Sequence, residues 1–342
     1  MAKKSVRIAV VGAGAAAQIN HIPALRKLKD VEVVAVCDPD VARRHAVSQK
    51  FGIPEAFEDF QDLLRADHLD LDAIDICAPT HLHGAMALAA LSYGKHVLVE
   101  RPFVQKTSEA EALVQAAAKA DRIVMVAMNH RFRPDAQTLW QFIQKKEIGP
   151  VYFAKAGYLR GRESWRTGAQ GGRGFDVVAG QRGVLLDLGL QMLDLALWLT
   201  GGSVVSVSAS MHASEKGKAE DSAAGFVRLD TGATITLDVS WGLLQDKDFA
   251  FVNLFGPKGT ALFNPLRLLK SLHGNLVNVT PTAAATEQSH YKKSYEVEVE
   301  HFVDCVRRGV QPASPAEEAL TLMRVVDALY KSADTGKEVR LA

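Results

Sequence analysis

The chain has 342 residues, of which 48% are hydrophobic and 23% are charged. This length exceeds the ~250–300 residues at which single cores stop growing, so we expect two domains in an ordinary globular protein. The 40 Lys and Arg residues against 39 Asp and Glu leave a formal net charge of +1. Because the positive and negative charges nearly cancel, the protein has no long-range electrostatic field to attract nucleic acid or an anionic membrane.

The cysteines and apolar runs exclude several classes of protein. The three cysteines Cys37, Cys77 and Cys305 form no Cys-x-x-Cys pair, so we expect reduced thiols in a cytoplasmic protein. No stretch reaches the ~18 apolar residues that a membrane-spanning helix needs. No two histidines stand with carboxylates at metal-ligand spacing, so we expect no metal.

The first third of the chain alternates strand and helix patterns. In chain order we expect a strand at Val6–Val11, a helix at Ala15–Lys29, a strand at Val31–Cys37, a helix at Asp40–Phe51, a strand at Ala73–Cys77, a helix at Leu82–Tyr93, a strand at His96–Val99, a helix at Ser108–Ala120 and a strand at Ile123–Ala127. The strands are short apolar runs, typical of strands buried on both faces. This alternation predicts an α/β Rossmann domain with a doubly wound parallel sheet over residues 1–129.

The pattern changes after Asn129 and indicates an α+β domain over residues 130–342 with a mostly antiparallel sheet. In chain order we expect a helix at Arg131–Lys146, a strand at Val151–Tyr158, a long loop at Arg160–Gly183, a helix at Val184–Leu199, strands at Val204–Met211, Gly225–Leu229, Ala233–Trp241, Phe249–Phe255 and Thr260–Phe263, and helices at Tyr295–Arg308 and Pro315–Ser332.

A glycine fingerprint follows the first strand. The run Gly12-Ala13-Gly14-Ala15-Ala16-Ala17 fits G-x-G-x-x-A between a buried strand and a helix, the context that gives this weak motif its meaning. Gly12 permits the tight turn, Gly14 lets a pyrophosphate approach the backbone, and Ala17 keeps the helix close to the strand. The helix N-terminus then offers free N–H groups to the phosphates.

Asp38 ends the second strand, where a carboxylate binds the adenine ribose hydroxyls and repels a 2′-phosphate. Arg43 and Arg44 come only later, on the following helix. We therefore expect NAD rather than NADP. The alternative role for Asp38-Pro39-Asp40 is a helix N-cap, which is compatible with ribose binding.

These features resemble the glucose–fructose oxidoreductase, inositol dehydrogenase and rhizopine catabolism family, known as Gfo/Idh/MocA. The resemblance covers essentially the whole chain, and the segments that carry it are Gly12–Ala17, Ala78–His83, Gly94–Pro102 and Asp187–Asp194. The run from Gly94 to Glu100 is specific when it is combined with the fingerprint.

The resemblance implies a Rossmann domain and a C-terminal domain with a large open-faced sheet, through which a homodimer or homotetramer forms. It also implies NAD(P) and a carbohydrate-like substrate: a sugar, a polyol or a sugar acid. The positions expected at the cofactor are Gly12, Gly14, Ala15, Ala16, Asp38, Pro79, Thr80, His83, Glu100, Arg101 and Asn129. For His83 and Thr80, capping of the following helix is the competing interpretation.

Two residues depart from the family pattern. The family's Glu-Lys-Pro is here Glu100-Arg101-Pro102, and Gln191 stands four residues after Asp187 in place of a histidine. In the family that lysine and that histidine are the catalytic pair beside the nicotinamide. Arginine stays protonated at any working pH and glutamine does not titrate, so both usual proton carriers are lost.

Three hypotheses follow. In the first, the protein remains an oxidoreductase: Arg101 polarises the reacting oxygen, Gln191 hydrogen-bonds the substrate, and Asp187, on the same helix face, carries the proton. His130, Tyr158 or a water chain are alternative carriers. In the second, the protein binds a dinucleotide as a sensor or partner. In the third, the cofactor acts transiently in epimerisation, elimination or glycoside cleavage. Arg101 also has a plainer interpretation, an ion pair with Glu100.

The loop at Arg160–Gly183 is rich in arginine and glycine. In the family the equivalent region approaches the substrate, so we expect Arg162 or Arg166 to read a carboxylate or phosphate and Trp165 to cover an apolar sugar face. The competing interpretation is a solvated loop with scattered charge.

Two structural expectations complete the prediction. In Thr234–Ser240 the apolar side chains alternate with polar ones, which leaves one sheet face for a second subunit to cover. Asn20 and His21 are interpreted as ordinary residues of the first helix.

Overall fold

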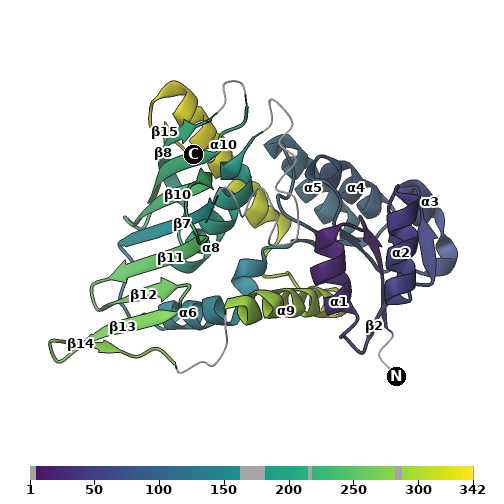
Figure 1. Ribbon diagram of the computed structural model, residues 1–342, viewed down its shortest axis with the longest axis horizontal. Coiled ribbons are helices and arrows are strands. Elements are labelled where there is room, and N and C mark those ends of the chain that lie inside the picture. Colours follow the sequence, from purple (N-terminus) through teal and green to yellow (C-terminus); the bar gives the residue numbers. More distant parts are fainter. Residues whose placement is uncertain (1–4, 162–181, 215–217, 282–286, 342) are drawn as a thin grey trace. The chain divides into compact units, whose positions relative to one another are not determined.

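The computed structural model describes residues 5–161, 182–214, 218–281 and 287–341 (Figure 1). Within this part of the chain no helix is long and apolar enough to cross a membrane. The residues divide into two compact units. The first unit comprises residues 1–129 together with 294–323, and the second comprises 130–293 together with 324–342. A single boundary after Asn129 therefore does not describe the division, because Ser294–Met323 return to the first unit.

The first unit is built from alternating strands and helices. Its elements are β1 (Val6–Val11), η1 (Ala17–His21), α1 (Ile22–Leu25), β2 (Val31–Cys37), α2 (Val41–Phe51), β3 (Glu55–Phe57), α3 (Phe60–Arg65), η2 (Asp67–Leu69), β4 (Ala73–Ile76), α4 (Thr80–Ser92), β5 (His96–Val99), α5 (Thr107–Ala120) and β6 (Val124–Val126), followed by η3 (Asn129–Phe132) at the boundary. Most of α9 (Glu287–Arg308) also belongs to it.

The six strands form one parallel sheet in the order β3-β2-β1-β4-β5-β6. The strands β1, β4, β5 and β6 are mostly apolar and almost fully buried, whereas the edge strand β3 is only half-buried, as expected for a parallel sheet covered by helices on either side. The strand order reverses between β1 and β4, which is the switch point where ligands bind in such sheets. The predicted Rossmann domain is confirmed.

The second unit contains a nine-stranded sheet and the helices that pack on it. Its elements are α6 (Pro134–Gln144), β7 (Phe153–Gly161), η4 (Leu185–Gly189), α8 (Leu190–Thr200), β8 (Val204–His212), β9 (Ser222–Leu229), β10 (Thr234–Leu243), β11 (Phe249–Gly256), β12 (Gly259–Phe263), β13 (Arg267–Leu272), β14 (Asn275–Asn278) and β15 (Val339–Arg340), together with the C-terminal part of α10 (Ala316–Thr335).

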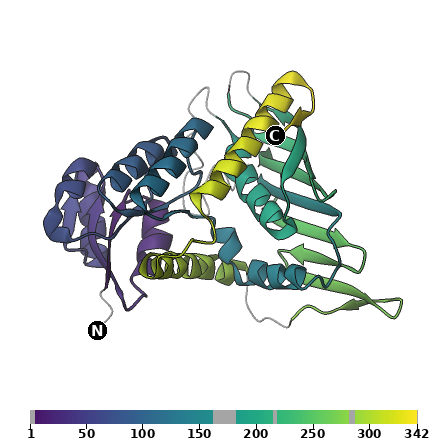
Figure 2. The same ribbon diagram turned by 180° about the vertical axis from the view of Figure 1, so that it is seen from behind.

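The strand order is β14-β13-β12-β11-β7-β10-β9-β8-β15, and every pair is antiparallel except β7 with β10. Ile235, Leu237 and Val239 of β10 are buried, while the alternate residues Thr234 and Asp238 are more exposed. The helices α6, α8 and the end of α10 lie on one face of the sheet (Figure 2). The expected open-faced sheet is confirmed, and the alternation holds from Thr234 to Val239, whereas Ser240 at its end is buried.

Several predicted elements differ in extent. The first helix ends at Leu25 rather than Lys29 and contains a π-helical turn at Ala17–His21. The last two helices begin or end beyond their predicted limits. The hairpin β13–β14 was not predicted, because Arg267, Lys270 and Asn275 interrupt the apolar pattern of its strands. The short elements β3, α3 and β15 were also not predicted.

Candidate functional site

The glycine turn after β1 fits a dinucleotide. Gly12 adopts φ +91°, and a Cβ there would lie 2.6 Å from the backbone of Cys77, so only glycine is accommodated. At Gly14, by contrast, a Cβ would meet no atom within 4 Å. The protein itself therefore places no steric demand on Gly14, and the open space above it is what an approaching pyrophosphate requires. Ala15 is exposed and Ala16 half-buried beside it.

Asp38 lies directly against this turn. Its Oδ2 accepts a 2.8 Å hydrogen bond from the amide of Ala13, and its Oδ1 accepts one of 2.9 Å from the amide of Asp40. The helix cap expected as an alternative is made by Asp40, whose side chain accepts from the amide of Arg43. Arg43 also brings Nη1 to 3.4 Å from Oδ2 of Asp38, a neighbour that spacing along the sequence did not reveal.

The ends of β4 and β5 carry the next predicted residues. Pro79 is exposed and precedes Thr80, the first residue of α4. His83 is buried, and its ring nitrogens lie 2.9 Å from the carbonyl oxygen of Pro102 and 2.8 Å from that of Ala78. Burial lowers the pKa of His83. Because both nitrogens contact backbone carbonyls, His83 holds the turn that follows Arg101, and its role at the cofactor stays a prediction.

Glu100 and Arg101 end β5. Oε2 of Glu100 accepts a 2.9 Å hydrogen bond from the Arg101 amide and lies 3.6 Å from the guanidinium Nη1 of Arg101. The side chain of Arg101 is 16% exposed. The predicted ion pair is therefore present, and it orients the guanidinium rather than leaving it on the surface. The Arg101–Pro102 peptide is cis.

Asn129, after β6, is fully buried and donates a 3.1 Å hydrogen bond from Nδ2 to Ser294 of α9. Its Oδ1 is buried without a hydrogen-bond partner among the described residues. An orphaned amide oxygen is costly in a protein interior. It is therefore an available acceptor for a group that the chain itself does not provide, such as a carboxamide N–H.

His21 is a residue that sequence reasoning missed. It is fully buried, and its two ring nitrogens lie within 3.1 Å of the carboxylates of Asp75 and Glu100. Nothing in the sequence near His21 signals this, since Asp75 stands on β4 and Glu100 after β5. Only the arrangement of the sheet brings the three side chains together.

In the second unit, η4 and α8 carry Asp187 and Gln191. Gln191 is buried and its Nε2 donates a 3.0 Å hydrogen bond to the backbone carbonyl of Asp187. The predicted shared face is thus present at the helix start, where Asp187 is half-buried. Arg131 fixes the same helix through a buried, two-pronged ion pair with Asp194, with N–O distances of 2.8 Å and 2.5 Å.

Tyr158 of β7 lies near Asp187 within this unit. Burial raises the pKa of Tyr158 to about 12, and the charges that act on it come from Arg160, Tyr291, Asp248 and Asp187. Arg160 in turn lies 3.5 Å from Oδ2 of Asp248. A phenol with a raised pKa remains a hydrogen-bond donor at neutral pH, so Tyr158 is suited to binding a substrate oxygen and unsuited to accepting its proton.

His130 is buried and packs edge-on against the ring of Phe263 at 6.2 Å. Arg162, Trp165 and Arg166 lie outside the described residues, so their roles stay predictions from the sequence.

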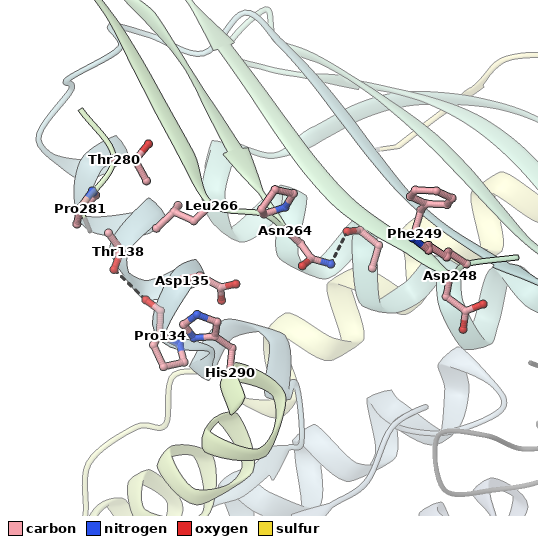
Figure 3. A pocket seen from close by; sticks show the side chains of 13 residues that line it. Pro134, Asp135, Thr138, Asp248, Phe249, Asn264, Leu266, Thr280, Pro281 and His290 are labelled. Atoms are coloured by element: carbon pink, nitrogen blue, oxygen red, sulfur yellow. Dashed lines mark hydrogen bonds between the residues drawn. The ribbon is translucent and has the colours of Figure 1, made fainter. Parts of the chain in front are cut away.

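A cavity of about 650 Å³ opens in the second unit (Figure 3). Asp248 and Phe249 at the start of β11 border it, together with Asn264 after β12, Asp135 of α6 and His290 of α9. Asp248 also forms the ion pair with Arg160, and both charges act on Tyr158. The cavity therefore shares Asp248 with the surroundings of Tyr158. Carboxylate, amide and aromatic groups together are the chemistry that binds sugar hydroxyls and an apolar sugar face.

Comparison with known proteins identifies relatives along the whole chain. The model of the "oxidoreductase family, NAD-binding Rossmann fold" matches residues 6–128, and that of the "GFO/IDH/MocA C-terminal domain" matches residues 136–262. D-glucoside 3-dehydrogenase of Escherichia coli is 27% identical, with 100% of this chain and 99% of that protein covered.

D-xylose 1-dehydrogenase (NADP⁺) 2 of Haloferax volcanii is 30% identical, with 94% of this chain and 95% of that protein covered. Among solved structures, an oxidoreductase from Agrobacterium radiobacter in complex with NAD⁺, L-tartaric acid and magnesium superposes with a TM-score of 0.87. That structure is 24% identical and covers 98% of each chain, so it supports the fold.

Proposed function

The chain belongs to the Gfo/Idh/MocA family of NAD(P)-dependent oxidoreductases that act on CH–OH groups, and we propose that it oxidises a sugar, polyol or sugar acid with NAD. The observation that carries this proposal is the turn of Gly12 and Gly14 at the switch point of the parallel sheet, with the Asp38 carboxylate against it. Open backbone at Gly14 and a buried acid beside the turn are what a dinucleotide requires.

The reaction needs two transfers. NAD held at the turn of Gly12 and Gly14 would supply the acceptor for the hydride, which leaves the carbinol carbon with the electron pair of the C–H bond. The hydroxyl proton passes to a base, and the carbon–oxygen double bond forms as the O–H bond breaks. The chain's own residues must bind the oxygen, stabilise its developing negative charge and take the proton.

Arg101 supplies positive charge for the reacting oxygen, since it is held at the end of β5 and cannot itself accept a proton. We assign proton acceptance to Asp187, and hydrogen bonding of the substrate to Tyr158 and Gln191. The support is that Asp187 is half-buried beside Tyr158 and that Tyr158 keeps its proton. His130 remains the alternative acceptor.

The test is a screen of polyols, sugars and sugar acids for NADH formation across pH, after melting shifts have established cofactor binding. Turnover that rises through a pKa in the wild type, and loses that dependence in Asp187→Asn, is the expected result. A pH profile unchanged in Asp187→Asn, with His130→Ala abolishing it, overturns the assignment to Asp187.

The preference for NAD is a separate proposal. The Asp38 carboxylate repels a 2′-phosphate, yet Arg43 lies 3.4 Å from it and could attract one. We propose that Asp38 prevails, because it is buried against the turn whereas the Arg43 side chain is 48% exposed. A larger melting shift with NAD than with NADP is expected, and Asp38→Asn should narrow the difference. Arg43→Ala is the matched variant, since it should weaken any binding of NADP.

The replacement of the family's lysine and histidine favours a second candidate, a dinucleotide-binding sensor without turnover. Such a protein would bind NAD yet reduce it with none of the substrates screened. An enzyme that uses the cofactor transiently would consume substrate without net NADH accumulation. Assembly through the open sheet face stays a prediction, and light scattering of the purified protein measures it directly.

A further inference from the structure

A buried group of charged side chains lies next to Glu100 and Arg101 in the first unit. His21 is its centre. Nδ1 of His21 donates to the two carboxylate oxygens of Asp75 at 3.0 and 3.1 Å, and Nε2 donates to Oε1 of Glu100 at 3.0 Å. An imidazole that faces carboxylates through both nitrogens carries a proton on each, because a carboxylate only accepts. The geometry therefore defines His21 as a cation.

Glu100 connects this cation to Arg101. One oxygen of Glu100 accepts from His21, and the other accepts from the Arg101 amide and faces its guanidinium at 3.6 Å. Glu100 is thus held from both sides. If His21 were removed, Oε1 would lose its donor and the carboxylate could rotate away from the guanidinium.

Glu298 of α9 is the unexplained member. It is 0% exposed, and both of its carboxylate oxygens are buried without a hydrogen-bond partner among the described residues. Its electrostatic neighbours are Glu100, His21, Arg101 and Asp75. An ionised carboxylate in this position would be an unpaired buried charge beside two others, which is strongly destabilising.

The charges of the group balance only if Glu298 is neutral. His21 and Arg101 then offset Asp75 and Glu100. We propose that His21 and Glu298 are positioning residues for Arg101. His21 is a cation that lies between the carboxylates of Asp75 and Glu100 and holds Glu100 in place. Glu298 lies beside them as a neutral carboxylic acid. The cluster in this way fixes the direction in which the guanidinium presents its charge.

The titration behaviour agrees. Burial acts to lower the pKa of His21, but the adjacent Asp75 charge and its hydrogen bond leave that pKa well above 6.5. Burial, reinforced by the charge of Glu100, raises the pKa of Glu298 well above 4.5. For Glu100, burial is outweighed by the hydrogen bond from His21 and the charge of Arg101, which lower its pKa to about 2.

A metal ion is the competing occupant of such a group. The ligand atoms of His21, Asp75 and Cys77 lie within 4.8 Å of one another. However, both His21 nitrogens point at carboxylate oxygens at hydrogen-bond distance, and burial raises the pKa of Cys77 to about 12, which keeps its thiol protonated. Stoichiometric zinc in the purified protein, lost in His21→Gln, would overturn the proposal.

The first experiment needs no turnover, so it is independent of the proposed function. Infrared difference spectra at neutral pH should show the C=O stretch of a buried protonated carboxyl in the wild type and lose it in Glu298→Gln. Glu300→Gln is the control, since Glu300 is exposed on the same helix. A spectrum in which Glu298→Gln removes only a carboxylate band would overturn the proposal.

Thermal melting adds a second readout. A folded-state pKa above the unfolded value of 4.5 means that the folded protein holds a proton which the unfolded chain releases, so stability falls as pH rises. Glu298→Gln removes this slope. Its Tm should match the wild type near about pH 5 and exceed it near about pH 9. An equal loss of Tm at both pH values would mean that Glu298 is ionised and paired.

The role of His21 is tested with substrate in hand. His21→Gln should lower kcat about tenfold, the loss expected for one charge-assisted hydrogen bond, while the Kd for NAD stays within about twofold. His96→Gln is the matched control, because His96 is a half-buried histidine of the same unit, on β5, whose Nδ1 accepts from the Ile123 amide. An unchanged kcat in His21→Gln would overturn the positioning role. The infrared experiment tests the protonation of Glu298 independently of that result.

Discussion

The hydroxyl of Tyr330 donates a 2.6 Å hydrogen bond to Oε1 of Glu220. The same carboxylate accepts from the amides of Gly183 and Leu185, at 2.9 to 3.1 Å. A carboxylate at this point satisfies the free N–H groups at the start of a helix and opposes its positive dipole end. The start of the segment that carries Asp187 is therefore held by a residue far from it in sequence.

Tyr330→Phe should lower the free energy of unfolding by about 1.5–3 kcal/mol, because it removes a hydrogen bond to a buried charge. Burial and the charge of Glu220 raise the pKa of Tyr330, so the phenol stays protonated over the accessible pH range. Urea unfolding measures the loss. Tyr93→Phe is the control, since Tyr93 is 40% exposed, and equal losses in the two variants would contradict the assignment.

Alanine should destabilise the fold at Gly12 but not at Gly14. Gly12→Ala forces a Cβ to 2.6 Å from the Cys77 backbone at φ +91° and should destabilise the protein by several kcal/mol. Gly14→Ala meets no protein atom within 4 Å, so it should melt like the wild type and lose NAD-induced stabilisation. Melting curves with and without NAD distinguish the cases. Full NAD stabilisation in Gly14→Ala would mean that the pyrophosphate lies elsewhere.

Arg101→Lys should introduce a new ionisation into the pH dependence of kcat. The guanidinium stays protonated, whereas a lysine amine beside Glu100 titrates within reach of experiment. We expect the kcat of the variant to fall as the amine deprotonates, because the positive charge at the reacting oxygen is then lost, and this limb is one that the wild type lacks. If Arg101 lay outside the reacting centre, wild type and variant would share one profile.

Removing one partner of the buried pair of Arg131 and Asp194 should lower the free energy of unfolding more than replacing both partners with apolar residues. Asp194→Leu alone leaves a guanidinium without its partner in the interior and should cost about 3–5 kcal/mol. The double variant Arg131→Met/Asp194→Leu removes both charges and should recover much of that loss. A double-mutant cycle by urea unfolding measures the coupling, and strictly additive losses would show that the two side chains act independently.

Glu100 should make stability depend on acid. Its folded pKa of about 2 lies below the ordinary 4.5, so its stabilising contribution is present above 4.5 and is lost as pH falls through about 2. Glu100→Gln should therefore be less stable than the wild type at neutral pH and approach it in acid. Unfolding free energies from about pH 7 to about pH 3 test this. A constant difference across the range would show that the carboxylate is not preferentially ionised in the folded state.

The dinucleotide half of the site was predictable because its signals are local. Gly12, Gly14 and Asp38 stand at the ends of apolar runs, and apolar strands with alternating helices define a parallel sheet without knowledge of any distant contact. The strand alternation in β10 was equally local. Arg101 and Gln191 were found by comparison with a family motif rather than by their own pattern.

What escaped prediction is long-range. His21 meets Asp75 and Glu100 across 54 and 79 residues, and Glu298 enters the same group from α9. No spacing rule links such positions, because the fold alone decides which strand ends become neighbours. The contacts of His83 escaped prediction for the same reason, because its partners Pro102 and Phe103 come from the turn after the next strand.

The return of Ser294–Met323 to the first unit has a consequence for synthesis on the ribosome. The side chain of His21 is covered by the ring of Tyr295, at 5.6 Å between centroids, and Asp30 is bound by Arg307. The nascent N-terminal unit therefore emerges with a charged, incompletely covered interior. Synthesis must therefore pass residue 323 before the first unit is complete, and a fragment that stops at residue 129 lacks the segment that covers His21 and binds Asp30.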